Sequence, residues 1–339
     1  MKTGILLINL GSPEAPTASA VRPYLREFLS DPRVIDIPAP LRWLLLNAVI
    51  LPFRPAKSAA AYAKVWTPEG SPLIANSRAF TAKLAAALGD EYHVVLGMRY
   101  GKPSLSEAIA ELTREPLKEL VIFPLYPQYA SASTGSSLEE ALRVLGSLQN
   151  VPTVRTIPAF YNDAGYIQAL VENATPRLEE FKPDYVLFSY HGLPERQIRK
   201  SEMHGEHCLS ADDSCCAAIG PRNAFCYRAH SFATTRLVAN KLGLAAGTYS
   251  TSFQSRLGRT PWIKPYTDLV LTELAHNGVK RLAVFSPSFV ADCLETLEEM
   301  TIRGSETFLA AGGEALELIP ALNSSDMWVN AAARLARGK

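Results

Sequence analysis

The sequence lacks the short motifs that identify most nucleotide-binding proteins built on parallel sheets. Neither GxGxxG nor a GxxxxGKS or GxxxxGKT segment occurs in it, which excludes the usual dinucleotide and P-loop sites, and we expect no nucleotide cofactor. A basic run is missing as well. The 34 Lys and Arg residues nearly balance the 33 Asp and Glu residues, leaving a formal net charge of +1. We therefore expect no nucleic-acid partner.

Long apolar runs are also absent. The N-terminal run covers only Ile5–Leu10, which suits a buried strand better than a signal peptide, so we expect a cytoplasmic protein. The longest apolar stretch, Leu41–Phe53, is shorter than the roughly 20 residues of a spanning helix and contains Arg42 and Asn47. It fits an amphipathic core helix. The alternative is a lip, within about 31–55, that rests peripherally on a membrane surface.

What the chain does contain is a regular alternation of β-rich apolar runs with stretches of helical periodicity. This pattern is typical of parallel sheets with helices on both faces. The 339 residues are enough for two domains. The sequence thus predicts an α/β protein with two Rossmann-like domains, each with a four-stranded parallel sheet flanked by helices. The predicted strands are Ile5–Leu10, His93–Gly97, Glu119–Pro124 and Thr153–Ile157, then Tyr185–Tyr190, Thr248–Thr251, Leu282–Ser286 and Glu317–Pro320.

The domain boundaries follow from the order of these elements. We expect the first domain to cover residues 1–160 and the second to cover residues 161–324. A last helix, within 325–339, is expected to pack back on the first domain. Ligands of open parallel sheets bind beyond the carboxyl ends of the strands, so the loops that follow the strands should carry the functional residues.

One such loop begins at His191, which follows the apolar run of DYVLFSY and precedes a turn containing Gly192 and Pro194. A neutral imidazole accepts a proton near neutral pH, which suits the deprotonation of a ring nitrogen. The alternative is a structural histidine that is hydrogen-bonded beneath the loop.

Three acids, Asp292, Glu295 and Glu299, occur in the segment ADCLETLEEM after another predicted strand. Their spacing places them on one face of an α-helix. Oxygen ligands of this kind hold a divalent ion loosely, and crowded acids raise one another's pKa. The alternative is that these acids complement the dipole at the start of an ordinary helix.

Two further loops carry residues suited to a ligand. The segment LYPQYASASTGSS, which includes Tyr126, leads into a helix whose N-terminus would attract an anion. The segment TSFQSRLGRTPWIKPYTD offers the Ser255 hydroxyl, the Arg256 cation and the Trp262 ring. This combination suits a large, flat ligand that bears carboxylates, although a plain turn with core residues has the same composition.

Four of the five cysteines lie close together, in an insert at about 200–228 that follows the histidine loop. Disulfides are rare in cytosolic proteins, so metal ligation is the natural interpretation. Four thiolates suit a [2Fe–2S] cluster or a structural Zn²⁺ ion, with His204 and His207 as substitutes, and free thiols are the third alternative. The four residues are Cys208, Cys215, Cys216 and Cys226.

Six segments, spread in order over almost the whole chain, resemble the ferrochelatase family, and in particular its Gram-negative bacterial members. The segments are NLGSPEAP, FLSD, YPQY with STGSS, SYHGLPER, FQSR with PW and PYTD, and ADCLETLEE. The resemblance implies a chelatase-like fold and a lyase that inserts Fe²⁺ into protoporphyrin IX to give protohaem, the terminal step of haem biosynthesis. Iron and the porphyrin are then substrates. The alternatives are a chelatase for Co²⁺ or coproporphyrin and a non-catalytic tetrapyrrole-binding protein.

The resemblance also implies roles for site residues. In the family, the residues that match His191 and Glu295 lie on opposite sides of a bent porphyrin. His191 would accept the pyrrole protons, and Glu295, with Asp292 and Glu299, would serve metal passage or proton exit. The expected porphyrin contacts are Leu10, Arg54, Tyr126, Phe253, Ser255, Trp262 and Phe289, with Arg54 as the partner of a propionate.

Two departures from the family pattern bear on these expectations. Relatives that act on coproporphyrin have a tyrosine in the first loop, near the position of Leu10, which favours protoporphyrin here. Many relatives have a second histidine where this chain has Cys293. A subset of bacterial members carries four cysteines in the second domain, so the resemblance favours the [2Fe–2S] cluster, and peripheral contact with the inner membrane would fit the lip.

Overall fold

The computed structural model describes residues 1–202, 208–209, 214–258 and 260–338. The chain forms two compact units. Unit 1 comprises Met1–Tyr126, Ser131–Pro158 and Val329–Lys339, and unit 2 comprises Pro127–Ala130 and Ala159–Trp328. The chain therefore passes from one unit to the other four times, after residues 126, 130, 158 and 328.

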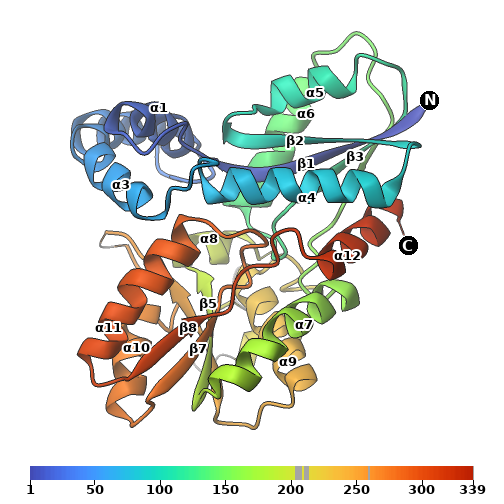
Figure 1. The fold of residues 1–339 in the computed structure, drawn as a ribbon. Helices are drawn as coiled ribbons and strands as arrows, with labels where there is room; N and C mark the ends of the chain where they lie inside the picture. Colours follow the sequence, from blue (N-terminus) through green and yellow to red (C-terminus); the bar gives the residue numbers. More distant parts are fainter. Residues whose placement is uncertain (203–207, 210–213, 259, 339) are drawn as a thin grey trace. The chain divides into compact units, whose positions relative to one another are not determined.

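A parallel sheet forms the centre of unit 1, with the strand order β2-β1-β3-β4 (Figure 1). The apolar run of β1 is buried on both faces, as expected for a parallel strand between two layers of helices. The strands of unit 1 are β1 (Lys2–Ser12), β2 (Tyr92–Gly101), β3 (Leu117–Pro124) and β4 (Val154–Thr156).

Helices cover both faces of this sheet, with α4 on one side and α5 and α6 on the other (Figure 1). A capping box starts α5, because Ser104 Oγ accepts the N–H of Glu107 and the Glu107 carboxylate accepts the N–H of Ser104. The α-helices of unit 1 include α1 (Ala18–Ser30), α2 (Ala39–Leu44), α3 (Leu51–Val65), α4 (Pro72–Leu88), α5 (Leu105–Leu112) and α6 (Ser136–Leu145).

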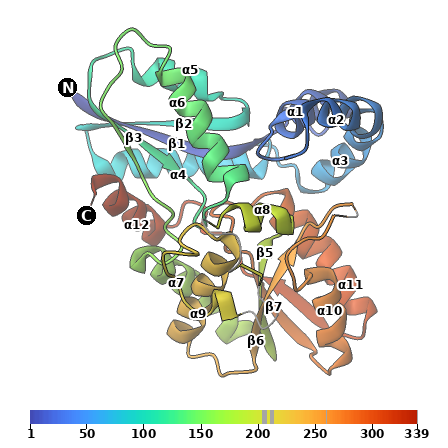
Figure 2. The same ribbon diagram turned by 180° about the vertical axis from the view of Figure 1, so that it is seen from behind.

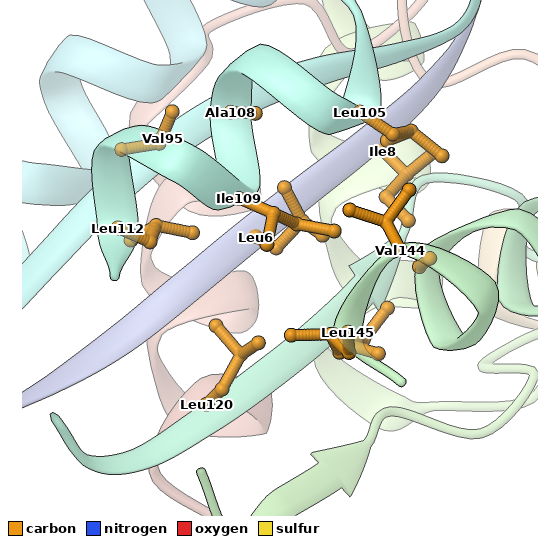
Figure 3. Close-up of a cluster of buried hydrophobic side chains, with 12 residues drawn as sticks. Leu6, Ile8, Val95, Leu105, Ala108, Ile109, Leu112, Leu120, Val144 and Leu145 are labelled. Carbon is orange, nitrogen blue, oxygen red and sulfur yellow. The ribbon is translucent and has the colours of Figure 1, made fainter. Parts of the chain in front are cut away.

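Alternate residues of β1 enter the two layers of the unit 1 core. Leu6 and Ile8 pack into a cluster with buried side chains of β2, β3, α5 and α6 (Figure 3). On the opposite face, Asn9 Nδ2 donates to Ser77 Oγ of α4 at 3.2 Å. This packing fixes the carboxyl end of β1, where Leu10 lies.

A buried polar network joins the end of α1 to β2 and α6 in unit 1. Asp31, from the FLSD segment, accepts hydrogen bonds from Arg99, Tyr100 and Ser136 at one carboxylate oxygen. Its other oxygen accepts the N–H of Arg33. Burial alone would raise the pKa of Asp31, but these hydrogen bonds and the charge of Arg99 together lower it.

Unit 2 contains a second parallel sheet, with the strand order β6-β5-β7-β8. One face packs against α10, α11 and the segment between β7 and α11, and α7 and α9 lie on the other face (Figures 1 and 2). The elements are β5 (Tyr185–His191), β6 (Tyr249–Gln254), β7 (Arg281–Phe285), β8 (Ala315–Leu318), α7 (Ala164–Phe181), α8 (Glu195–Lys200), α9 (Tyr227–Leu242), α10 (Thr267–His276), α11 (Ser305–Ala310) and the short 3₁₀-helix η3 (Ser214–Cys216).

The last helix, α12 (Asp326–Arg337), runs from unit 2 into unit 1. Its first residues remain in unit 2, where the Trp328 ring stacks on Phe160 at 5.4 Å. Its end is bound within unit 1. Arg155 donates to the carbonyl oxygen of Ala336, and Arg337 donates to that of Ala87 at 2.9 Å.

Among the described residues, three segments are π-helical. The π-helix is rare in proteins, and where it occurs it often lies at a functional site. Each occurs in a segment that the sequence singled out: the apolar stretch, the YPQY loop region and the acidic segment. They are η1 (Leu45–Ile50), η2 (Ser131–Gly135) and η4 (Glu295–Gly304).

The apolar stretch at 41–53 is not a core helix, so that prediction is wrong. It forms α2, η1 and the start of α3, and its largest side chains face solvent: Trp43 is 67% exposed and Phe53 is 74% exposed. Leu46 and Leu51 are buried and attach the stretch to unit 1. In the part of the chain that the structure describes, none of the helices combines the length and apolarity that crossing a membrane requires.

The predicted fold class is confirmed. Each of the eight predicted strands occurs, and they form two four-stranded parallel sheets flanked by helices. The predicted strand positions differ from the observed ones by a few residues at the ends, where hydrophobic periodicity carries little information.

Candidate functional site

His191 is the last residue of β5, which lies between β6 and β7 in the unit 2 sheet. The loops after these three parallel strands therefore leave the sheet on the same side, at the carboxyl ends of the strands. The backbone N–H of His191 donates to Ser288 Oγ, in the loop after β7, at 3.2 Å. The half-buried imidazole lies near two aromatic rings, with centroid distances of 6.4 Å to Trp262 and 6.3 Å to Phe289.

The hydrogen bond of the imidazole defines its tautomer. Nδ1 of His191 lies 2.6 Å from the carbonyl oxygen of Gly192, and a carbonyl oxygen can only accept. Nδ1 therefore carries the hydrogen of the neutral ring, and Nε2 carries the basic lone pair. A ring fixed in this way can accept a proton at Nε2.

Gly192 is required where β5 and β6 approach each other beyond His191. Its N–H donates to the carbonyl oxygen of Gln254 at 2.8 Å. A Cβ at this position would lie 2.7 Å from that oxygen and 3.1 Å from the Trp262 ring. Any side chain would therefore push the histidine loop away from its neighbours.

Gln254, the last residue of β6, joins the histidine strand to the acidic segment. Its backbone pairs with His191, and its side-chain Nε2 donates to the carbonyl oxygen of Glu295 at 2.9 Å. Its Oε1 accepts from Ser189 Oγ at 2.8 Å. The structure thus brings His191 and Glu295 to elements held together by one buried glutamine.

Glu299 binds the loop after β6. Its carboxylate accepts the backbone N–H of Ser255 at 2.9 Å and the Ser255 hydroxyl at 2.6 Å. Ser255 has a φ of +67°, which a serine rarely adopts and which costs on the order of 1 kcal/mol. The two hydrogen bonds from Ser255 to Glu299 hold that conformation.

The prediction that Asp292, Glu295 and Glu299 share one α-helical face is wrong. Asp292 precedes the helix, and η4 is a π-helix, whose residues do not follow the 3.6-residue period. Asp292 is buried and accepts from Thr296 Oγ1 at 2.9 Å and from Asn323 Nδ2 at 2.8 Å. Its carboxylate therefore joins the start of η4 to the chain after β8.

Cys293 is a buried neighbour of Glu295. Burial raises the pKa of its thiol well above the ordinary value, and the charge and hydrogen bond of the Glu295 carboxylate add to this. The thiol therefore stays protonated and donates to Glu295. Glu295 itself is half-buried at the first position of η4.

The aromatic and hydroxyl residues predicted to contact a ligand fall into two groups. Trp262, Phe289 and Ser255 are half-buried around the histidine loop and are accessible. Phe253 is 1% exposed and packs against Phe232 at a centroid distance of 6.2 Å, so it is a core residue and the predicted ligand contact is wrong.

The remaining predicted contacts belong to unit 1. Leu10 is half-buried near the carboxyl end of β1, and Arg54 is exposed on α3. Tyr126 is 9% exposed and its hydroxyl accepts from Ser137 Oγ at 3.3 Å. Burial raises the pKa of Tyr126, so its hydroxyl remains neutral.

Sequence reasoning missed Gln254 and Ser288, which position His191 and Glu295. Both occur inside or beside the recognised segments, but nothing in their residue type distinguishes them from ordinary loop residues. Only the pairing of β5 with β6 and β7 shows that they contact the histidine strand.

The four clustered cysteines are all buried in unit 2, and none of the five cysteines forms a disulfide. Cys215 Sγ and Cys216 Sγ lie 3.8 Å apart. Cys226 forms thiol hydrogen bonds with Cys208 and Cys216. The bond between Cys226 and Cys216, together with burial, raises the pKa of Cys216, and burial raises the pKa of Cys208. The guanidinium of Arg228 donates to Cys216 Sγ at 3.3 Å.

The thiols are therefore neighbours, but they are not arranged as a formed metal centre. Within residues 1–202, 208–209, 214–258 and 260–338, no three His, Cys, Asp or Glu side chains converge as metal ligands do. His204 and His207, the predicted substitute ligands, lie outside the described residues.

Comparison with known sequences places relatives along the full chain. The profile of the family described as Ferrochelatase matches residues 2–339. Ferrochelatase of Coxiella burnetii (strain Dugway 5J108-111) is 48% identical over 336 residues, which cover 99% of this chain and 93% of that protein. Ferrochelatase of Legionella pneumophila (strain Corby) is 47% identical over 331 residues, covering 98% and 97% respectively.

Solved structures share the fold at low sequence identity. The sirohydrochlorin chelatase SirB from Bacillus subtilis subspecies spizizenii, in complex with cobalt, has a TM-score of 0.55 at 11% identity and covers 99% of this chain and 94% of that chain. SirB from Bacillus subtilis with Fe³⁺ has a TM-score of 0.51 at 10% identity, covering 99% and 95%. These likenesses support the two-domain α/β fold.

Proposed function

Because this chain belongs to the ferrochelatase family, and is therefore a ferro-lyase that makes protohaem from Fe²⁺ and protoporphyrin, we propose that His191 accepts the pyrrole protons. Insertion releases two protons, since the entering ion replaces the hydrogens of two pyrrole nitrogens. The observation that supports this role is the bond from Nδ1 of His191 to the Gly192 carbonyl oxygen, which leaves Nε2 basic. The imidazole would pass each proton on to solvent.

Glu295 is proposed as the carboxylate on the opposite side of the porphyrin. Glu295 is the first residue of η4. Its carbonyl oxygen accepts a hydrogen bond from the Gln254 side chain, and its carboxylate accepts one from the Cys293 thiol. Asp292 and Glu299 are proposed as supports of these loops instead of a metal path, because their oxygens already accept several hydrogen bonds. A porphyrin bound in a distorted form would present its nitrogen lone pairs to the entering ion.

Several residues are proposed as porphyrin contacts. Trp262 and Phe289 offer apolar surface beside the imidazole, and Ser255 offers a hydroxyl. In unit 1 we propose Leu10 and Tyr126 as further contacts and Arg54 as the partner of a propionate. In this arrangement the apolar rings would lie against the macrocycle and the Arg54 cation against its acidic edge.

An anaerobic assay that follows porphyrin fluorescence with Fe²⁺, and separately with Co²⁺, tests the assignment of His191. The His191→Ala variant should lose turnover by at least about a hundredfold, the lower range for loss of a general base, while it retains the native circular dichroism spectrum. Near-normal turnover would remove His191 from its role. Stoichiometric porphyrin binding without metallation by the unmodified protein would contradict catalysis altogether.

The cysteines are proposed to hold a [2Fe–2S] cluster. The chemistry of the donors supports this proposal, since the four thiols are buried in one part of unit 2 without disulfides and Arg228 places a cation against Cys216. The group, when bound, would contribute folding energy to the surrounding segment. Cys208, Cys215, Cys216 and Cys226 would hold it.

Anaerobically purified protein should then contain near-stoichiometric iron and sulfide and should absorb visible light. The Cys216→Ser variant should lose this absorption. The Cys293→Ser variant should retain it, because Cys293 lies just before η4 and is not one of the four clustered cysteines. A colourless protein loaded with zinc would refute the cluster.

The exposed apolar stretch at 41–53, together with the exposed Arg54, is proposed as a lip that rests on the inner membrane of a cytoplasmic protein. Its support is the exposure of Leu41, Trp43 and Phe53, since such side chains seldom cluster on a surface that contacts only water.

A further inference from the structure

His230 lies in α9, one helical turn after Cys226, and is 1% exposed. Both nitrogens of its ring form hydrogen bonds to backbone groups. Nδ1 lies 3.2 Å from the backbone nitrogen of Tyr129, and Nε2 lies 2.9 Å from the carbonyl oxygen of Ala224. Because a backbone N–H can only donate and a carbonyl oxygen can only accept, Nδ1 is the acceptor and Nε2 carries the hydrogen.

The ring thus connects two segments that are far apart in the sequence. Ala224 stands two residues before Cys226, at the end of the cysteine-bearing segment 214–226. Tyr129 is the last residue of the YPQY motif and belongs to the segment 127–130, which is part of unit 2. The plane of the imidazole is fixed by Tyr161, whose ring is stacked on it at 3.7 Å with an interplanar angle of 10°.

A second contact between the same two segments supports the first. The ring of Phe225, the residue before Cys226, meets the Tyr129 ring edge-on at 5.3 Å. Tyr129 is therefore held by its backbone through His230 and by its ring through Phe225. Both contacts originate within four residues of Cys226.

From the segment 127–130 the contacts continue to the histidine loop. The Gln128 side chain is 2% exposed, and its Nε2 donates to Thr234 Oγ1 at 3.2 Å and, at 3.5 Å, to the carbonyl oxygen of Pro287. Pro287 precedes Ser288, whose hydroxyl accepts the backbone N–H of His191. A continuous set of contacts within unit 2 thus leads from Cys226 to His191.

We propose that His230 is a positioning residue that couples the cysteine-bearing segment 214–226 to the segment 127–130, so that a group bound by the thiols fixes the loop that supports the reacting site. The proposal deepens the proposed function and, in the part that concerns the bound group, rests on the cluster. His230 touches neither substrate nor metal. It acts through Tyr129 and Gln128.

Hydrogen–deuterium exchange at the Tyr129 amide measures this coupling directly, because that N–H donates to the imidazole. In the protein as purified, removal of the iron by a chelator under reducing conditions should accelerate exchange at Tyr129 about tenfold, the scale of a lost buried hydrogen bond. Amides of β5 should not change, since the core of the sheet remains folded.

Two conservative variants separate the two hydrogen bonds of His230. His230→Asn places an acceptor near the position of Nδ1 and retains the bond to Tyr129, whereas His230→Gln places a donor near the position of Nε2 and retains the bond to Ala224. Exchange at Tyr129 should be fast in His230→Gln and slow in His230→Asn, and in neither should it respond to removal of iron. The matched control, His276→Gln at the exposed end of α10, should behave as the unmodified protein.

The outcomes distinguish this proposal from that of the cluster. Slow exchange at Tyr129 in His230→Gln, or an unmodified protein whose Tyr129 does not respond to iron removal, would overturn the coupling. A protein purified without iron and sulfide would refute the cluster alone. In that case Cys226→Ser replaces iron removal, and an unchanged Tyr129 exchange rate in that variant would again overturn the coupling.

Discussion

Several single residues around His191 hold the loops of unit 2 in place. Glu299 is the clearest case, because its carboxylate accepts both the N–H and the hydroxyl of Ser255, a residue with left-handed backbone. Gly192 has a similar function through its lack of a side chain. The geometry of the imidazole therefore depends on residues that do not react.

The Glu299→Gln variant tests whether this acid supports the loop or passes metal. Replacing one carboxylate oxygen by an NH₂ group sets a donor against the donors of Ser255 and Gln254, so the loop should loosen. We expect the KM for porphyrin to rise about tenfold, which corresponds to about 1.4 kcal/mol, with little change in the KM for Fe²⁺. Steady-state kinetics with each substrate varied measure this.

Glu306→Gln, an exposed acid in the first turn of α11, is the matched control and should leave both constants unchanged. A rise in the KM for Fe²⁺ with an unchanged KM for porphyrin would show instead that Glu299 serves the metal.

Elements are joined in unit 1 by the buried carboxylate of Asp31, which connects the end of α1 to β2 and α6. The Asp31→Asn variant leaves Arg99 without its charged partner, so we expect a loss of about 3 kcal/mol at pH 7. Urea unfolding measures it.

The pH dependence of this loss follows from the lowered pKa of Asp31. A carboxyl whose pKa is lower in the folded state stabilises the protein above its unfolded pKa, near 4, and this stabilisation disappears as the pH falls through the folded value. The difference in stability between the unmodified protein and Asp31→Asn should therefore shrink below about pH 4. A difference that stays constant from pH 7 to pH 3 would contradict this account.

The proposed lip at 41–53 predicts that exposed apolar side chains contribute to binding to lipid vesicles. Replacing Trp43 and Phe53 together by serine removes two exposed apolar side chains, so binding to anionic vesicles should weaken by at least about tenfold. Co-sedimentation measures the change. Leu142→Ser, which alters an exposed apolar residue of α6, should bind as the unmodified protein does, and equal binding by all three proteins would exclude the lip as a membrane contact.

The elements that could be predicted from the sequence are those whose apolar pattern indicates that both faces of a strand are buried. The central strands β1, β3, β5 and β7 contain buried apolar runs, so their positions along the chain were predictable. The apolar stretch at 41–53 has a similar composition, and hydrophobicity alone does not show whether an apolar face meets a core or remains exposed. The acidic segment failed for another reason, since its spacing was interpreted with the α-helical period while η4 is a π-helix.

The same limit applies to the candidate site. His191 could be placed because it ends an apolar strand, but the inward direction of Phe253 depends on its packing against Phe232. The roles of Gln254 and Ser288 depend on strand pairing, which brings together loops that the sequence separates.

At the scale of the whole molecule, the end of the chain supports the unit in which the chain begins. The buried alanines of α12 and the bond from Arg337 to Ala87 belong to unit 1. A chain that ends at Trp328 should therefore unfold at a temperature lower by about 10 °C. Ala332→Glu, at a position with 0% exposure, should produce a similar decrease, and calorimetry measures both.

Arg337→Ala removes one exposed hydrogen bond and should change the unfolding temperature by little. Unaltered unfolding of both the shortened chain and Ala332→Glu would show that α12 does not contribute to the stability of unit 1.

Because the chain passes four times between the two units, the gene is constrained in how it can recombine. No uninterrupted stretch of coding sequence specifies either unit, because each is assembled from separated pieces. A single recombination event therefore cannot exchange, duplicate or delete one unit while it leaves the other whole.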